Sequence, residues 1–211
     1  MIKAAATLKS LQFSQKTLTD CYGRLSFGPV NPGQGLTIGN ALRRILLNDL
    51  PGIAVIGAEI DGVQSEFSSL PGIRESVIEI FLNLRELILS PIDSSTKGAK
   101  STKPFTFAKL KPNLNIKSFP YVITAGDLDI GDYCLVDPNQ PIATVLSKAA
   151  ADNFKLTVFI GQGRSYQSWK KLPGVPQLMD QRFFESFESN QTNQRSVTFP
   201  IDAIFMPIKQ V

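Results

Sequence analysis

The stretch Gly33–Leu50, GQGLTIGNALRRILLNDL, has the clearest helical period in the chain, and the rest of the fold is built around it. At about 100° per residue, six apolar side chains share one side, which predicts a face turned toward a core. They are Ile38, Ala41, Leu42, Ile45, Leu46 and Leu50. The other side carries Asn40, Arg43, Arg44 and Leu47. A leucine between arginines suits a protein interface, because the arginine stems cover apolar surface. A single exposed leucine with no partner fits the same spacing.

Strand-like and helical segments lie on both sides of this helix, separated by Pro and Gly. Leu11–Phe27 predicts a hairpin with its turn near Asp20–Gly23. Pro51–Gly52 ends the helix, and Ile53–Ile60 is strand-like. A second helix is predicted over Arg74–Leu89. Its buried stripe consists of Val77, Ile80, Phe81, Leu84, Leu87 and Ile88.

The second half of the chain is a succession of short strands. Between Phe105 and Gly161 they alternate with Gly, Pro and Asp, which indicates an antiparallel sheet or small barrel. Ser90–Lys103 and Ser186–Arg195 are polar and predict surface loops, whereas Val197–Met206 returns to strand-like character. The predicted fold class is therefore α+β.

Composition excludes several kinds of chemistry. The 211 residues contain two cysteines and no histidine, so serine–histidine and cysteine–histidine catalysis are excluded. The cysteines indicate a reducing environment or simple burial. No run of about 18 apolar residues is present, so we expect no membrane span. The net charge of +4 becomes −2 when the six lysines between 97 and 117 are left out, so the basicity is local. Those lysines could contact phosphates, but a solubilising loop is favoured because no aromatic residues alternate with them.

Three motifs invite a ligand, and each has a structural alternative. Gly33–Gly39 is near a dinucleotide fingerprint, but the spacing is off by one and a βαβ context is lacking. Asp127–Asp132 could hold Mg²⁺, although a solvated turn is favoured. Gly161–Tyr166 lacks the P-loop lysine; its Arg164 and Tyr166 suit an interface, and a β-turn fits equally well. We therefore expect no catalytic residue, metal or cofactor on this chain.

The segment GLTIGNALRRILLNDLPGIAVIGAEIDGV, residues 35–63, resembles the N-terminal domain of the RNA polymerase alpha subunit of bacteria and plastids. That family reads close to G-x-T-[LI]-G-N-A-L-R-R-[IV]-L-L. Four further blocks resemble it in the same order: Gly72–Leu89, Thr124–Leu128, Gly163–Tyr166 and Phe199–Val211. The closing block is similar to plastid-encoded subunits, which implies a plastid location, with a bacterial cytoplasm as the alternative.

The resemblance implies two intertwined domains. A dimerisation domain of two-helix and antiparallel-sheet character would comprise residues 1–52 and 172–211, interrupted by an inserted, mostly β domain over residues 53–171. In the family, a long helix follows the segment matching FMPIKQV and completes the dimer interface, and a separate C-terminal DNA-binding domain comes after it. The 211 residues contain neither, so we expect this piece alone to be poorly soluble or partly disordered near its ends.

The implied function is assembly of a DNA-directed RNA polymerase, in which two such domains pair and recruit the two large catalytic subunits. Nucleotidyl transfer then belongs to the complex, and DNA is reached only through it. Carried over by position, Arg44 and Leu47 match a contact to the second-largest subunit, and Arg85 matches a contact to the largest. Arg164 and Tyr166 match the family segment that lies against a large subunit. The alternatives are a small β-rich nucleotide-binding protein or enzyme, and a direct DNA binder.

Overall fold

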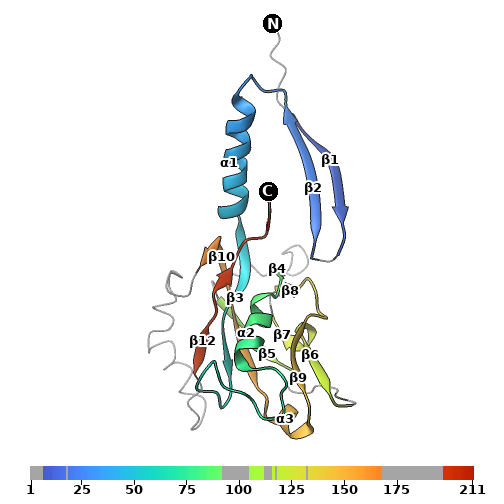
Figure 1. Ribbon diagram of the computed structural model, residues 1–211, viewed down its shortest axis with the longest axis vertical. Coiled ribbons are helices and arrows are strands. Elements are labelled where there is room, and N and C mark those ends of the chain that lie inside the picture. Colours follow the sequence, from blue (N-terminus) through green and yellow to red (C-terminus); the bar gives the residue numbers. More distant parts are fainter. Residues whose placement is uncertain are drawn as a thin grey trace.

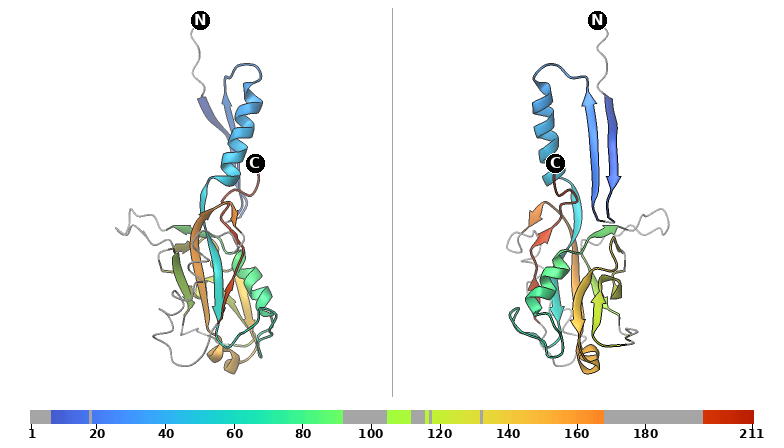
Figure 2. Two further views of the ribbon diagram at one scale, coloured as in Figure 1. Left: turned by 90° about the vertical axis from the view of Figure 1, so that its left-hand side faces the viewer. Right: turned by 45° about the vertical axis from the view of Figure 1, so that its right-hand side comes forward.

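The computed structural model describes residues 7–17, 19–91, 105–111, 116, 118–131, 133–167 and 197–211. It consists of an arm and a body (Figures 1 and 2). The arm is one helix and one β-hairpin that project from the same end of the body, and the body is built on a β-sheet. The C-terminal segment returns to the junction between the two parts. There the Lys209 ammonium lies 3.5 Å from the Asp20 carboxylate in the hairpin turn.

The predicted hairpin is confirmed. Strands β1 (Thr7–Gln15) and β2 (Cys21–Gly28) pair antiparallel, with a register break between Ser10 and Gln12. The turn lies earlier than predicted, since Lys16 N donates to Asp20 O at 3.0 Å. Paired and alternate residues share a face of a two-stranded sheet, so one face of this hairpin is apolar. That face carries Leu8, Phe13, Leu25 and Phe27, which are 65%, 71%, 63% and 44% exposed.

Helix α1 (Gln34–Asn48) confirms the predicted helix but not its predicted burial. It follows Gly33, whose φ of 85° lies in the left-handed region that favours glycine. None of its 15 residues is buried, and Leu42 and Ile45 are 45% and 47% exposed. The prediction that the apolar side faces a core is therefore wrong for the part of the chain that the structure describes. Periodicity shows which side of a helix is apolar but does not show what covers it.

The body contains a five-stranded antiparallel sheet in the order β12-β3-β10-β5-β7, which confirms the predicted sheet. The strands are β12 (Thr198–Pro200), β3 (Pro51–Ile60), β10 (Leu156–Arg164), β5 (Phe105–Leu110) and β7 (Leu128–Asp129). Residues 54–58 of β3 are all buried, because the strand is covered on both faces. Gly161 and Gly163 are residues of β10, so the turn considered for Gly161–Tyr166 can begin only after them.

One face of the sheet packs against the second helix and two small β-ladders. Helix α2 (Val77–Arg85) is shorter than predicted, but Val77, Ile80, Phe81, Leu84 and Leu87 are buried as predicted and Ile88 is half-buried. The ladders pair β6 (Tyr121–Thr124) with β9 (Pro141–Val145), and β4 (Leu89–Pro91) with β8 (Tyr133–Leu135). The short helices η1 (Ala125–Asp127) and α3 (Lys148–Asn153) flank β6 and β9. An α+β fold is confirmed.

Two carboxylates fix the start of α2. Glu79 accepts hydrogen bonds from the backbone N and the hydroxyl of Ser76, at 2.8 and 3.0 Å, which is the capping-box arrangement. Glu75, the residue before Ser76, accepts hydrogen bonds from the backbone N and Oγ1 of Thr144 in β9, at 2.5 and 2.8 Å. Arg85 is the last residue of α2, so these contacts at the start of the helix also fix the position of Arg85 on the body.

The opposite face of the sheet holds a second, smaller core of Ala54, Ile56, Ala203 and Phe205. The last two come from the C-terminal segment, where β13 (Ala203–Ile204) pairs with β11 (Tyr166–Gln167). The division at residues 52/53 and 171/172 stays a prediction. β3 begins at Pro51, and β12 forms the edge of the sheet beside β3. The predicted loop over Ser186–Arg195, and residues 92–103 of the predicted Ser90–Lys103 loop, lie outside the described residues.

Cys21 and Cys134 are both exposed and form no disulfide, so of the two alternatives simple burial is wrong, and a reducing environment stays a prediction. Among the described residues, no helix is long and apolar enough to cross a membrane.

Candidate functional site

The arm presents the first group of predicted contact residues. Asn40, Arg43 and Arg44 are exposed on α1, and Leu47 is half-buried. Leu47 is thus no more exposed than Leu42 and Ile45 on the opposite side of the helix. Both sides of α1 are therefore open to other chains: one is charged with a single leucine, and the other is apolar.

The second group of predicted contact residues, Arg85 and Tyr166, lies near the C-terminal end of α2. The Tyr166 hydroxyl donates to Asp202 Oδ2 at 2.8 Å, joining β11 to the loop before β13. This hydrogen bond, together with partial desolvation and the Asp202 charge, raises the pKa of Tyr166, while the positive charge of Arg85 acts in the opposite direction. Arg85 and Asp202 line the same end of one groove, and Asp202 accepts the hydrogen bond from Tyr166, so the three residues form one polar cluster.

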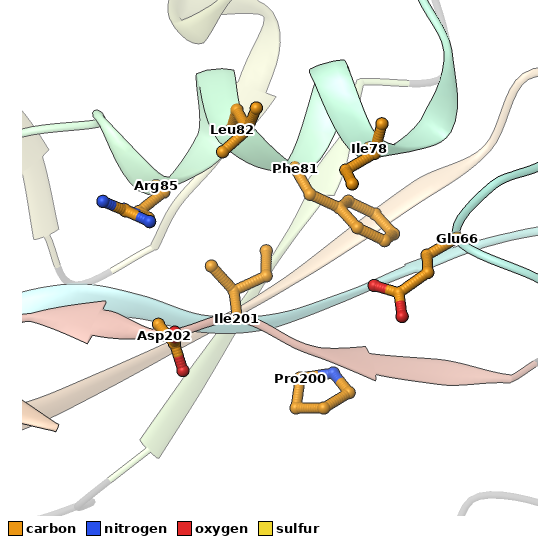
Figure 3. A pocket seen from close by; sticks show the side chains of 8 residues that line it. All are labelled: Glu66, Ile78, Phe81, Leu82, Arg85, Pro200, Ile201 and Asp202. Atoms are coloured by element: carbon orange, nitrogen blue, oxygen red, sulfur yellow. The ribbon is translucent and has the colours of Figure 1, made fainter. Parts of the chain in front are cut away.

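A shallow groove of about 240 Å³ runs from this cluster along α2. Figure 3 shows Arg85 and Asp202 at one end and Glu66 at the other, with apolar side chains between them. The groove is lined by Glu66, Ile78, Phe81, Leu82, Arg85, Pro200, Ile201 and Asp202. Leu82 and Ile78 are 52% and 38% exposed at its edge. A strip with charged ends and an apolar middle suits a peptide segment better than a compact polar metabolite.

The segment between β10 and β11 links the cluster to the arm. Ser165 has a φ of 61°, in the left-handed region, which makes the turn expected as one alternative for Gly161–Tyr166. Its hydroxyl donates to Asn48 Oδ1 at 3.5 Å, at the last residue of α1. The Arg164 side chain is exposed at the end of β10, and its carbonyl accepts from Gln167 Nε2 at 3.2 Å. Whether Arg164 contacts a partner stays a prediction.

The other ligand motifs have structural roles in the described residues. Gly35 and Gly39 lie within α1, and β2 before them is half of a hairpin, so the parallel βαβ unit of a dinucleotide site is not formed here. Asp127 accepts from Thr124 N at 2.9 Å and from the Tyr121 hydroxyl at 3.3 Å, and so caps η1. Asp129 lies in β7, and Asp132 lies outside the described residues. Within the described ranges, no group of three His, Cys, Asp or Glu side chains is placed to hold a metal ion.

Two of the six clustered lysines are described. The Lys111 ammonium donates to Gly126 O at 2.6 Å, and the Lys109 ammonium lies 5.8 Å from the centre of the Phe107 ring. Both therefore have partners within the body. The other four, Lys97, Lys100, Lys103 and Lys117, lie outside the described residues.

Sequence reasoning missed Asp202 and the C-terminal residues beside it. Asp202 lies in a strand-like run, and nothing in its local pattern indicates that it meets Tyr166. The pairing arises because β13 returns to β11, and no short-range signal could predict that contact. The sequence shows that Tyr166 and Asp202 are present, but only the fold shows that they are in contact.

The body is thus an antiparallel sheet with α2 across one face. Residues 58–175 match the family model described as the RNA polymerase Rpb3/RpoA insert domain, and the chain belongs to this family. Over 211 residues it is 77% identical to the DNA-directed RNA polymerase subunit alpha of Ostreococcus tauri, covering 100% of this chain and 59% of that protein. The resemblance to polymerase alpha subunits is thus confirmed.

Two more distant relatives carry the same name. The DNA-directed RNA polymerase subunit alpha of Emiliania huxleyi is 35% identical over 97% of this chain and 55% of its own length. That of Thermosynechococcus vestitus is 34% identical over 90% of this chain and 50% of its own length. The chain therefore spans between half and three fifths of the length of these three relatives.

Proposed function

We propose that this chain is an assembly scaffold of a DNA-directed RNA polymerase, which pairs with a second copy of itself and recruits the two large catalytic subunits. The family and the names of the relatives support this proposal. Nucleotidyl transfer would be performed by the complex, and DNA would be reached only through it. In this role the chain works by presenting surfaces, so the proposal depends on which surfaces are open.

The observation that carries the proposal is the arm, where a 15-residue amphipathic helix has no buried residue. Leu42 and Ile45 on α1 are nearly half exposed. The hairpin, whose apolar side chains are also exposed, lies beside α1 (Figure 2). Several exposed large apolar side chains gathered on one part of a protein mark a protein interface. We assign this surface to the second copy, because an isologous contact places the same apolar faces against each other.

The charged side of α1 is assigned to the second-largest subunit. Arg44 and Leu47 lie there, with Arg43 and Asn40 beside them, and all four remain accessible to a partner when the apolar side is covered. Arginine offers a planar donor fork to a carboxylate or to backbone carbonyls, and Leu47 adds an apolar contact. One helix would thus serve two interfaces.

The groove along α2 is assigned to the largest subunit. Arg85 and the Tyr166–Asp202 pair stand at one end of an apolar strip, and Tyr166 is 50% exposed. Tyrosine and arginine are the residue types that most often dominate the energy of an interface. Arg164, exposed at the end of β10, would extend this contact.

We also propose a plastid location. The 77% identity with the Ostreococcus tauri protein supports it, as does the similarity of the closing block to plastid-encoded subunits. The alternative, a bacterial cytoplasm, is supported by the 34% identity with the Thermosynechococcus vestitus protein. Immunodetection of the native chain in purified plastids would support the first location, and its absence from them would count against it.

The experiment that tests the scaffold role is co-purification of Arg44→Ala with each large subunit separately. We expect the variant to lose the second-largest subunit and to keep the second copy of the chain, because Arg44 lies on the charged side of α1. Arg24→Ala removes another exposed arginine, from the polar face of the hairpin, and serves as the matched control. If Arg44→Ala retains the second-largest subunit as well as the control does, the role assigned to Arg44 is wrong.

A further inference from the structure

Phe205 occupies a seat formed by two glycines. Gly52 in β3 and Gly163 in β10 are directly opposite each other in the ladder, and the Phe205 ring and backbone lie over them. A Cβ at Gly163 would lie 2.7 Å from the ring carbons Cδ2 and Cε2. A Cβ at Gly52 would overlap the Phe205 carbonyl, with the carbonyl carbon 2.7 Å away. Neither glycine has a left-handed backbone, so it is the space for Phe205 that requires them.

The seat fixes the register of the C-terminal segment against the turn that carries Tyr166. Phe205 N donates to Ser165 O at 3.0 Å, and the next pair in the ladder is Ile204 with Tyr166. Asp202, three residues before Phe205, then meets the Tyr166 hydroxyl at 2.8 Å. A shift of Phe205 out of the seat would move Asp202 and Tyr166 relative to each other, because the two strands share only this short ladder.

The same turn touches the arm. Ser165 Oγ donates to Asn48 Oδ1 at 3.5 Å, and Asn48 follows Leu47 in α1. The turn thus lies between the two surfaces assigned to the large subunits. Any displacement of Ser165 would therefore move both Tyr166, at the Arg85 end of the groove, and Asn48, at the C-terminal end of α1.

We propose that Phe205, held between Gly52 and Gly163, is the positioning residue that places the Tyr166–Asp202 pair beside Arg85 for binding of the largest polymerase subunit. This inference rests on the proposed function, and it adds residues that the resemblance does not supply. Phe205 does not contact the partner in this account. It acts through the register of β13 against β11, and Phe205 is 2% exposed whereas the neighbouring Ile204 is 37% exposed.

The seat can be disturbed separately from the main core. Phe205 belongs to the small cluster with Ala54, Ile56 and Ala203, which lies on the other face of the sheet from α2 and the main core. Substitution of Gly52 or Gly163 is therefore expected to change the position of Phe205 more than the overall stability of the chain. An ordinary core phenylalanine would give a general loss of folding, and a positioning residue gives a selective loss of one partner.

The test compares Gly163→Ala with Gly35→Ala in the chain co-expressed with each large subunit in turn. The added methyl group at Gly163 meets the Phe205 ring, whereas at Gly35 its nearest neighbour would be Val30 Cγ2 at 4.0 Å, an ordinary contact. We expect Gly163→Ala to weaken binding of the largest subunit by about tenfold or more, the factor for one lost charge-assisted hydrogen bond. Binding of the second copy and of the second-largest subunit should change by less than about threefold, as should binding of the largest subunit by Gly35→Ala, whose substitution lies in α1 and away from the groove.

A spectroscopic signature separates positioning from general damage. The Tyr166–Asp202 hydrogen bond raises the pKa of Tyr166 in the native chain, so Gly163→Ala should lower it toward the value of a free tyrosine. Nuclear magnetic resonance of labelled tyrosine follows this titration, with Tyr166→Phe to assign the signal. Tyr166→Phe should also reproduce the selective loss of the largest subunit, without any change in the seat.

The outcomes distinguish this inference from the function on which it rests. If the wild-type chain never binds the largest subunit, the proposed function fails. If the wild type binds and Gly163→Ala binds equally well, or keeps the Tyr166 titration unchanged, the positioning role is overturned. Should Gly163→Ala fail to fold, Phe205→Leu is the milder variant, and unfolding of both would make Phe205 a general core residue and overturn the proposal.

Discussion

Ile45→Ala should weaken pairing of two copies of this chain more than it destabilises a single copy. Ile45 lies on the apolar side of α1 and is 47% exposed, so about half of its side chain remains to be covered by a partner. Complete burial of an isoleucine is worth about 1.5–3 kcal/mol, so the uncovered half represents about 0.7–1.4 kcal/mol. An isologous interface contains the residue twice, which doubles the effect to about 1.5–3 kcal/mol per dimer.

That free energy corresponds to a dissociation constant raised about tenfold to a hundredfold. Sedimentation equilibrium over a range of concentrations measures the constant directly, and circular dichroism checks that the helix is retained. Leu146→Ala is the matched control, because Leu146 is 50% exposed but lies on the body, between β9 and α3. If Ile45→Ala and Leu146→Ala have the same small effect on the dissociation constant, the second copy does not cover this side of α1.

Two further predictions concern titrating groups. Burial alone would raise the pKa of Glu75, but the hydrogen bonds from Thr144 outweigh it and lower the pKa below its ordinary value of 4.5. A group whose pKa is lowered in the folded chain stabilises the fold above its ordinary pKa, and this stabilisation is lost as the pH falls through the lowered pKa. Glu75→Gln should therefore abolish part of the fall in melting temperature on acidification. An unchanged dependence of melting temperature on acid pH would show that Glu75 makes no such contribution. Arg85→Ala should raise the pKa of Tyr166 further and Asp202→Asn should lower it, because their charges act in opposite directions, and a tyrosine titration that moves in neither variant would contradict the cluster.

The second helix could be predicted from the sequence and the role of the first could not, for one physical reason. The α2 stripe meets other parts of the same chain, so its period predicts its burial, and Leu84 is 0% exposed. The stripe of α1 is as clear, but its apolar side is not buried by the described residues of this chain. Periodicity reports the chemistry of a face, and only a structure or a partner shows what lies against it.

The glycines show a second limit of sequence reasoning. Gly161 and Gly163 predict a turn by composition, because glycine is common in turns. In the structure they lie in a strand, and Gly163 leaves room for Phe205. Phe205 lies far along the chain, so the reason for Gly163 depends on a long-range contact. The contact between Tyr166 and Asp202 could not be predicted from the sequence for the same reason, although the sequence predicts Arg85 and Tyr166 as contact residues.

The most direct test of the scaffold role is native mass spectrometry of the chain co-expressed with both large polymerase subunits. We predict a complex that contains two copies of this chain and one of each large subunit, and that loses a large subunit when Arg44 or the Tyr166–Asp202 pair is changed. A chain that stays apart from both large subunits, as a monomer or in pairs alone, would contradict the account.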